Sequence, residues 1–332
     1  MRIHSVTENR AKPMETLTVK TLGKWQTIKS RRRLADYSFM VAFLFLLLIA
    51  TTMTDVFFTQ RNLSNLFRQI VTNGLLSFGM LIVIVSGGID LSIGPIVALT
   101  GIMAAGLQQF MWFPTGILIA LIVGITVGAA NGLLIARFKL QPFIVTLAMM
   151  GAIRGVVYVC SETPKVPTDP AFRALLGGGF IGPVPVPALI LMTFFPLVWI
   201  FLNRTTFGRS IVAIGGNEEA VRLAGINVSA HIILAYIISG LFAGIAGVLL
   251  ASRLGIAQPS VGVGYELDAI AAVVIGGGIL GGGGGGAVGT MGGVLALGLI
   301  DNLLNLFNVQ SYYQQILKGM IILFAVLARR KE

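Results

Sequence analysis

The sequence predicts an all-α polytopic membrane protein with about ten transmembrane helices, some short or broken, and with both termini in the cytoplasm. The observations behind this class are composition, recurring apolar runs and the placement of basic residues. Of the 332 residues, 55% are hydrophobic and only 11% are charged, whereas a soluble domain carries about 25% charged residues. The mean hydropathy of +0.88 points the same way. Such a deficit of charge is typical of a chain that lies mostly in lipid.

Apolar runs recur at lengths that suit a bilayer core of about 30 Å, crossed at about 1.5 Å per residue. The ten predicted spans lie near residues 36–54, 70–87, 92–112, 115–136, 143–160, 187–202, 229–251, 267–281, 287–305 and 313–328. With the N-terminus inside, an even number of spans returns the C-terminus to the cytoplasm. The closing Arg329, Arg330 and Lys331 agree with that side.

The chain divides into a basic cytoplasmic tail, 1–35, a membrane domain, 36–328, and a cytoplasmic end, 329–332. The tail is not a cleavable signal peptide, because the apolar run starts too far from Met1 and no small-residue cleavage pattern follows it. The net charge of +11 is compatible with nucleic-acid binding. However, the basic residues crowd into the tail and a few short loops, which the positive-inside rule explains better.

Two basic residues, Arg61 and Arg68, fall on the outer side of this topology, against that rule. We place them on a short interfacial helix, 62–69. The outer side also receives a proline-rich loop, 161–186, and the loop 252–266.

Two segments interrupt the helical pattern with glycine. One is Ser86–Pro95, and the other is Gly276–Gly286, which ends in six consecutive glycines. Glycine costs a helix about 1 kcal/mol and proline about 3 kcal/mol, so we expect unwound turns or broken helices. The approaches V-I-V-S-G-G and V-V-I-G-G-G are similar, as in transporters built from related halves. The glycine run lacks the Lys-Ser/Thr pair of a phosphate-binding loop, so we favour a close helix approach or a cytoplasmic turn.

Asp90 is the only acidic residue between Asp55 and Glu162. A carboxylate at the centre of a membrane helix costs about 2.5–3.5 kcal/mol, so an intramembrane acid is a functional candidate. The interpretation that we favour is a cap on a helix that opens at Leu91. Further polar groups that line a water-filled path or bond across helix pairs are Ser92, Asn73, Asn131, Asn302 and Asn305.

The sequence shows no catalytic constellation. His4 and His231 lie in the tail and at the edge of a span, without metal-ligand spacing around either. The single cysteine, Cys160, cannot form an intramolecular disulfide. We therefore expect neither a catalytic site, nor a metal, nor a cofactor.

The stretch Phe207–Ile226 is the polar exception among the internal loops. Asn217 can cap a short helix, 218–224, whose first residues are acidic and whose Arg222 lies near the C-terminal end. Gly225 would close it. This helix is either an ordinary interfacial helix or an amphipathic knob that fits a groove on a cytoplasmic partner.

Several of these segments resemble the ribose-type permeases, the membrane subunits of bacterial sugar importers of the ATP-binding cassette (ABC) class. The similar segments are Gly215–Ala220 with Arg222–Val228, Ala257–Pro259 with Gly264–Val274, Ser86–Ser92, and Ser311–Gln314. The resemblance runs from about residue 36 to the end. One departure is that members usually carry a basic residue in the glycine run, which Gly281–Gly286 lacks.

The resemblance implies the permease subunit of a pentose or hexose importer, which forms the translocation pathway by alternating access. It implies a homodimeric or heterodimeric pore in the bacterial inner membrane, two separate ATP-hydrolysing subunits and a soluble extracytoplasmic sugar-binding protein. It implies ATPase coupling through the loop 203–228, by Gly216, Asn217, Glu218, Glu219, Ala220, Arg222 and Gly225. It implies docking of the binding protein through Gln258, Tyr265, Glu266 and Asp268. The chain itself would not hydrolyse ATP.

The alternative is a self-sufficient ion- or proton-coupled secondary transporter or channel. Such a protein needs acidic groups deep within its spans. The candidates for that role are Asp90 and Asp301, together with Arg154 and Lys318.

Overall fold

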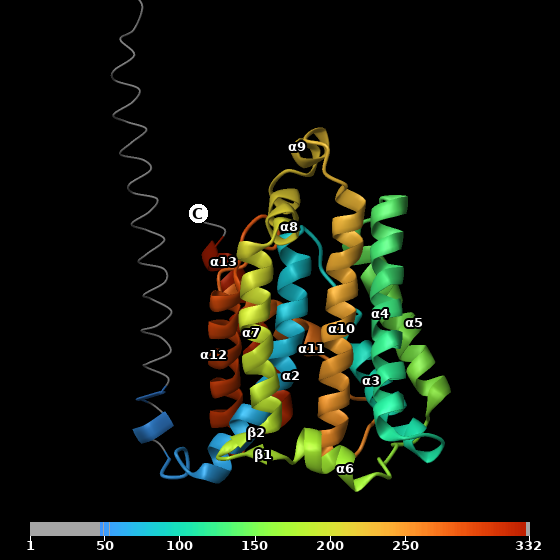
Figure 1. Ribbon diagram of the computed structural model, residues 1–332. Helices are drawn as coiled ribbons and strands as arrows, with labels where there is room; N and C mark the ends of the chain where they lie inside the picture. The colour runs from blue at the N-terminus through green and yellow to red at the C-terminus, as the bar shows by residue number, and fades with distance from the viewer. Residues whose placement is uncertain (1–46, 49, 53, 330–332) are drawn as a thin grey trace, which may run out of the picture. The chain divides into compact units, whose positions relative to one another are not determined.

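The computed structural model describes residues 47–48, 50–52 and 54–329, and this part of the chain is mainly helical (Figure 1). The main helices are α2 (Gln60–Val85), α3 (Ile93–Gly106), α4 (Phe113–Phe138), α5 (Pro142–Cys160), α7 (Val186–Arg204), α8 (Thr206–Gly216), α9 (Glu218–Leu223), α10 (Val228–Leu254), α11 (Tyr265–Ile275), α12 (Ala287–Leu306) and α13 (Ser311–Arg329). The tail 1–35 and most of the predicted span 36–54 lie outside the described residues.

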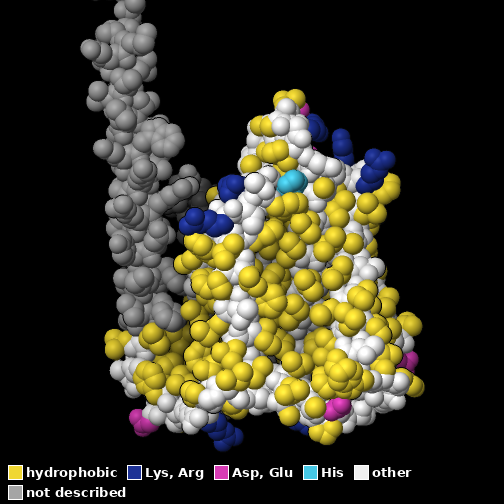
Figure 2. Space-filling model, viewed as in Figure 1, with side chains coloured by type: hydrophobic (Ala, Val, Ile, Leu, Met, Phe, Trp, Pro, Cys, Tyr) yellow, Lys and Arg dark blue, Asp and Glu magenta, His cyan; other side chains and the backbone are white. Residues whose placement is uncertain are grey.

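Six helices in the described part of the chain are long and apolar enough to cross a membrane: α2, α4, α5, α7, α10 and α12. Figure 2 shows hydrophobic side chains over most of the flank of this bundle. α2 lies at its centre and buries most of its residues, whereas α5 buries few. The predicted class, a polytopic helical membrane protein, is confirmed.

Three predicted boundaries need correction. The span predicted at 92–112 is a 14-residue helix, α3, followed by a 3₁₀ turn, Leu107–Gln109. The span predicted at 267–281 is the 11-residue α11, because the glycines end it at Ile275. The interfacial helix predicted at 62–69 is wrong, since α2 begins at Gln60, where the Thr59 side chain caps it, and continues unbroken.

The two glycine-rich breaks use the same helix-terminating geometry. After α2, Gly87 N donates to Ile84 O at 2.9 Å and Gly88 N donates to Val83 O at 3.0 Å. After α11, the N–H groups of Gly277 and Gly278 bond Val274 O and Val273 O at 3.1 and 2.8 Å. Gly87 and Gly277 have φ angles of 92° and 104°, which favour glycine. The predicted unwound turns are confirmed, and the similar sequences form similar turns.

Small residues line the contact between α4 and α10. On α4 they recur at every fourth position, at Gly116, Ala120, Gly124, Gly128 and Gly132. A Cβ atom added to Gly124 would lie 2.6 Å from the carbonyl oxygen of Gly240 on α10. Such spacing lets helix backbones approach closely, as in other membrane helix pairs.

The loop 161–186 contains α6 (Pro170–Phe172), a π turn (Arg173–Gly177) and a small hairpin, β1 (Phe180–Ile181) with β2 (Val184–Pro185). It pairs with the loop after α10, because Lys165 and Ala257 exchange main-chain hydrogen bonds of 2.9 and 2.8 Å. Arg154 donates to the carbonyl oxygens of Pro259 and Val261 at 2.6 and 2.8 Å. Arg68 donates to Gly178 O at 3.1 Å. Both arginines therefore hold loops at the end of the bundle away from α9.

Candidate functional site

The polar stretch forms two helices at one end of the bundle, α8 and α9, which we call the projecting segment (Figure 1). Asn217 caps α9, because its Oδ1 accepts a hydrogen bond from Ala220 N at 2.9 Å. Gly225 follows with a φ of 82°. The predicted cap and short helix are confirmed. The sequence analysis missed α8, although Thr205 caps it by accepting from Gly208 N at 3.0 Å.

α9 is open to solvent over most of its surface. Glu218, Glu219, Ala220 and Arg222 are exposed, and Arg222 forms an ion pair with Glu219. Val221 is the buried contact of α9 and packs in one cluster with Ile214 and Val228, which attaches α9 to α8 and α10. Leu223 is 79% exposed and was not predicted. An exposed apolar side chain beside charged ones suits a pocket on a partner protein.

Main-chain contacts connect the projecting segment to the membrane helices at a meeting point of Gly87, Gly215, Gly282 and Gly283, the glycine junction. A Cβ atom on Gly215 would lie 2.5 Å from Gly283 N. One on Gly282 would lie 2.8 Å from Gly215 Cα and 2.9 Å from Gly87 Cα. Gly283 N also donates to Val85 O at 3.0 Å. Of the two alternatives predicted for the glycine run, a close helix approach or a turn, the run forms a turn, and this turn packs closely against the ends of α2 and α8.

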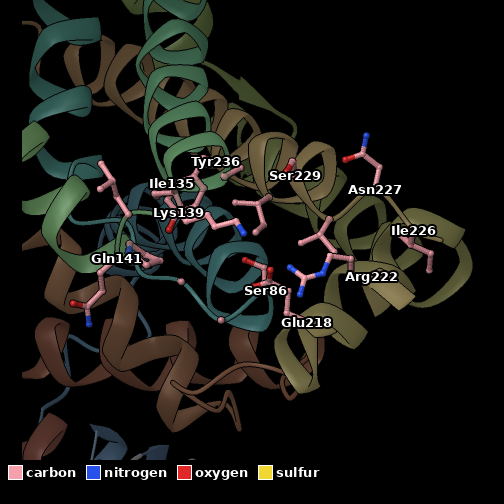
Figure 3. A pocket seen from close by; sticks show the side chains of 17 residues that line it. Ser86, Ile135, Lys139, Gln141, Glu218, Arg222, Ile226, Asn227, Ser229 and Tyr236 are labelled. Atoms are coloured by element: carbon pink, nitrogen blue, oxygen red, sulfur yellow. The ribbon is translucent and has the colours of Figure 1, made fainter. Parts of the chain in front are cut away.

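A cavity of about 630 Å³ opens beside α9, between the ends of α2 and α4 and the starts of α5 and α10. Its polar lining includes Ser86, Gln141 and Ser229. In Figure 3, Lys139 and Arg222 direct their nitrogen-bearing ends toward the middle of this cavity from opposite sides. A shift of α9 would therefore change the shape of the cavity.

Three predicted path residues, Asp90, Ser92 and Asn131, meet in a buried polar cluster with Ser239. Asp90 Oδ1 accepts from the main-chain N and the hydroxyl of Ser92 at 3.0 and 2.6 Å, and its Oδ2 accepts from Ser239 at 2.8 Å. Asn131 donates to Ser92 Oγ at 2.8 Å. The predicted cap on a helix that opens at Leu91 is wrong, because α3 begins at Ile93 with Ser92 at its N-cap position. Asp90 bonds Ser92 instead and is fully buried. The cluster joins α3, α4 and α10.

The other predicted path residues lie apart from this cluster. Asn302 and Asn62 exchange side-chain hydrogen bonds of 2.9 and 3.1 Å and join α12 to α2. Asn305 accepts from Gln314 at 3.0 Å. Asn73 lines a cavity of about 100 Å³ between α2 and the α10–α13 helices.

That smaller cavity contains an ion-paired cluster. Lys318 Nζ lies 2.9 Å from Asp268 Oδ2 and 3.0 Å from Asp301 Oδ2. Tyr265 and Arg253 also line it. We call this cavity the outer chamber. It brings together residues of α2, α10, α11, α12 and α13 that are far apart in the sequence.

The four residues predicted to dock a binding protein differ in their exposure. Gln258 is exposed, whereas Tyr265, Glu266 and Asp268 are partly buried. Glu266 Oε1 accepts from Gly264 N at 3.2 Å. Tyr265 and Asp268 line the outer chamber.

Comparison with known proteins places the chain in a family. Residues 62–326 match the family described as "branched-chain amino acid transport system / permease component". The chain is 43% identical over 317 residues to the ribose import permease protein of Escherichia coli strain K12, covering 92% of this chain and 99% of that protein. It is 43% identical over 294 residues to the ribose import permease protein of Bacillus subtilis strain 168, covering 86% and 90%. It is 37% identical over 299 residues to the L-arabinose transport system permease protein of Escherichia coli strain K12, covering 89% and 90%. No solved structure matches.

The fold defines a multi-pass membrane protein with a projecting segment at one end. The family match and the identities given above make the assignment specific: the chain belongs to this family of transport-system permease components.

Proposed function

We propose that the chain is the permease subunit of an ATP-driven sugar importer in the bacterial inner membrane, with a pentose as the transported sugar. The observation that carries this proposal is the 43% identity that extends over 99% of a ribose import permease. The L-arabinose relative transports another pentose by name. The projecting segment supports the same function, because a permease that is driven by a separate ATPase needs a contact surface for it.

In the proposed topology, ten helices cross or enter the membrane, both termini are cytoplasmic, and α9 lies in the cytoplasm. Figure 2 supports this orientation, since most of the Lys and Arg side chains on this face surround the end with α9. In a Cys160→Ser background, a cysteine at Glu218 should react with an impermeant maleimide only after the cells are opened. A cysteine at Gln258 should react in intact cells, and the reverse pattern would overturn the orientation.

Two ATPase subunits would bind the projecting segments of two permease subunits, which are either identical or related. Gly216, Asn217, Glu218, Glu219, Ala220, Arg222 and Gly225 would form the ATPase-coupling surface, with Leu223 as its apolar anchor. ATP binding would shift α9, and α8 would pass that shift through the glycine junction to α2 and to the segment before α12. The pore would then face the two sides of the membrane alternately.

On the outer side, a soluble sugar-binding protein would dock around Gln258 and the neighbouring loop, with Tyr265, Glu266 and Asp268 beneath that surface. The amide pairs and the Asp90 cluster would border the path inside the bundle. Gln258→Arg, at an exposed position, should weaken docking of the binding protein and leave ATPase assembly unchanged.

The decisive experiment reconstitutes the permease in liposomes with its ATPase and binding protein and measures uptake of labelled D-ribose and L-arabinose. We expect uptake that needs ATP on the side of the membrane where the ATPase is bound. It should also need the binding protein on the opposite side. Uptake by the permease alone, driven by an ion gradient, would instead establish a secondary transporter.

A further inference from the structure

The outer chamber collects polar side chains that have no partner. Gln69, Thr72, Asn73, Arg253 and Tyr265 all line it. Within the part of the chain that the structure describes, none of these five side chains makes a hydrogen bond or an ion pair. Thr72 is buried and the other four are partly buried. Together they give a molecule in the cavity five side chains with which to form hydrogen bonds.

Asp301 provides a separate observation. Asp301 is only 3% exposed. Its Oδ2 contacts Lys318, whereas its Oδ1 has no hydrogen-bond partner among the described residues. A buried carboxylate oxygen without a partner loses its hydration and gains nothing in return. Oδ1 thus offers an acceptor to a molecule that donates a hydrogen bond from the chamber.

The charges around the chamber select the class of this molecule. Asp268 and Asp301 are matched by Lys318 and Arg253, so the lining is formally neutral. A neutral lining gives no net attraction to either a cation or an anion, whereas it presents both donors and acceptors. Hydroxyl groups both donate and accept, so a neutral polyhydroxylated molecule fits all of these groups at once.

The position of the chamber suits the entry side of a transport path. Arg253 lies in the last turn of α10, and Tyr265 and Asp268 lie in the first turn of α11, at the end of the bundle opposite α9. The volume of about 100 Å³ accommodates roughly three water molecules at about 30 Å³ each. A sugar ring is larger than this volume, so its entry requires the chamber to widen. α13 forms one wall of the chamber through Lys318, and Ile316 and Leu323 on the same helix are more than half exposed.

We propose that the outer chamber is an intramembrane recognition site for the hydroxyl groups of the transported sugar, which displace its water. This proposal rests on the function proposed above and assigns to the permease a share of the sugar selectivity. Thr72, Tyr265 and Asp301 would contact the sugar directly.

The test uses the complete importer in liposomes, with D-ribose and L-arabinose as competing probes. Thr72→Val and Tyr265→Phe each remove one hydroxyl and keep the shape. The matched controls are Thr126→Val on α4 and Tyr158→Phe on α5, two exposed residues on the apolar flank. Loss of one neutral hydrogen bond should slow ribose uptake by about three- to tenfold. It should also change the ribose-to-arabinose ratio, while the controls leave both unchanged.

The binding protein is the same in every sample, so an altered ratio must come from the permease. Basal ATPase activity and the melting temperature of the complex identify any variant that has simply misfolded. A ratio that stays at the control value in both variants would overturn the proposal. If the unaltered complex shows no ATP-dependent uptake at all, the proposed function fails instead, and the two failures are distinct.

A second measurement follows occupancy directly. In a Cys160→Ser background, Thr72→Cys should be labelled by a small water-soluble thiol reagent. We expect ribose to slow that labelling at least about threefold, a change comparable to one hydrogen bond, and potassium chloride of equal osmolality to leave it unchanged. Protection by the salt alone would indicate an ion site, and failure to label would contradict a water-filled chamber. Thr126→Cys is the control that ribose should not protect.

Discussion

The two ends of the bundle are held together by different kinds of contact, by the main chain at one end and by side chains at the other. Around α9, the glycine junction joins three segments by main chain alone, with Gly282 positioned so that an added Cβ would lie 2.7 Å from Gly215 O. In the outer chamber, charged side chains of four helices meet beside polar side chains of α2. Main-chain contacts have no rotamers, so no side-chain rearrangement can absorb a displacement of one segment before it reaches the next. Side-chain clusters can rearrange around a ligand. The difference fits a cytoplasmic end that a partner moves and an outer end that binds a ligand.

Lys318→Met should have the largest effect on stability, because it tests whether the outer end depends on its charges. The substitution leaves Asp268 and Asp301 without their cation. Removing one partner of a buried ion pair costs about 3–5 kcal/mol. The melting temperature of the detergent-purified subunit should fall, and adding Asp301→Asn should restore part of it. An unchanged melting temperature in the single variant would show that the cluster is not stabilising.

Gly282→Ala should have the next largest effect and tests the cytoplasmic end. Gly282 has a φ of 91°, and its Cβ would collide with Gly215 and Gly87. A left-handed conformation costs an alanine about 1–2 kcal/mol before any clash. We expect ATP-driven uptake to fall about tenfold, which corresponds to about 1.4 kcal/mol, while ATPase subunits still bind. Gly281→Ala is the control, since its Cβ would meet none of the described atoms within 4 Å.

Asn217→Ala should have a smaller effect, confined to the projecting segment. Loss of an N-cap costs about 0.5–2 kcal/mol, which is large for the six-residue α9. Binding of the ATPase, measured by titration in detergent, should weaken about fivefold. Asn227→Ala removes the equivalent cap of the 27-residue α10 and should leave binding unchanged, because packing holds that helix. Equal effects in the two variants would argue against α9 as the contact.

Glu219→Gln should have the smallest effect on stability. Its ion pair with Arg222 is exposed, and exposed pairs contribute about 0–1 kcal/mol. The melting temperature should stay the same, while binding of the ATPase loses part of its salt dependence. A clear drop in melting temperature would mean that the charges of α9 serve the fold rather than a partner.

The sequence predicted what depends on local chemistry. The apolar runs placed the six long helices, the Asn217 cap placed α9, and the glycines placed both helix breaks. The predicted helix boundaries were wrong where charged residues and apolar residues in the same segment favoured different structures. Residues 62–69 looked interfacial because Arg61 and Arg68 are charged, but Arg68 reaches the carbonyl of Gly178 and α2 continues past it.

The sequence did not predict which polar residues meet. Asn73 and Asp268 were assigned to different roles, yet they line the same chamber. Asp90 and Ser239 are 149 positions apart and share a hydrogen bond. Such meetings depend on the way α10 and α11 pack against α2 and α3, and no local pattern of residues encodes that packing. The exception is the contact between α4 and α10, which the recurrence of small residues at every fourth position of α4 could have indicated.

That recurrence on α4 also limits motion. Gly124, Gly128 and Gly132 lie directly against the main chain of α10, and the polar cluster of Asp90 and Asn131 ties α3 to the same pair. The next equivalent register lies four residues away, a slide of about 6 Å. We therefore expect α3, α4 and α10 to move together as one rigid body. Any opening of the permease then requires movement of the helices around that body, which include α13 and the chamber wall that it forms.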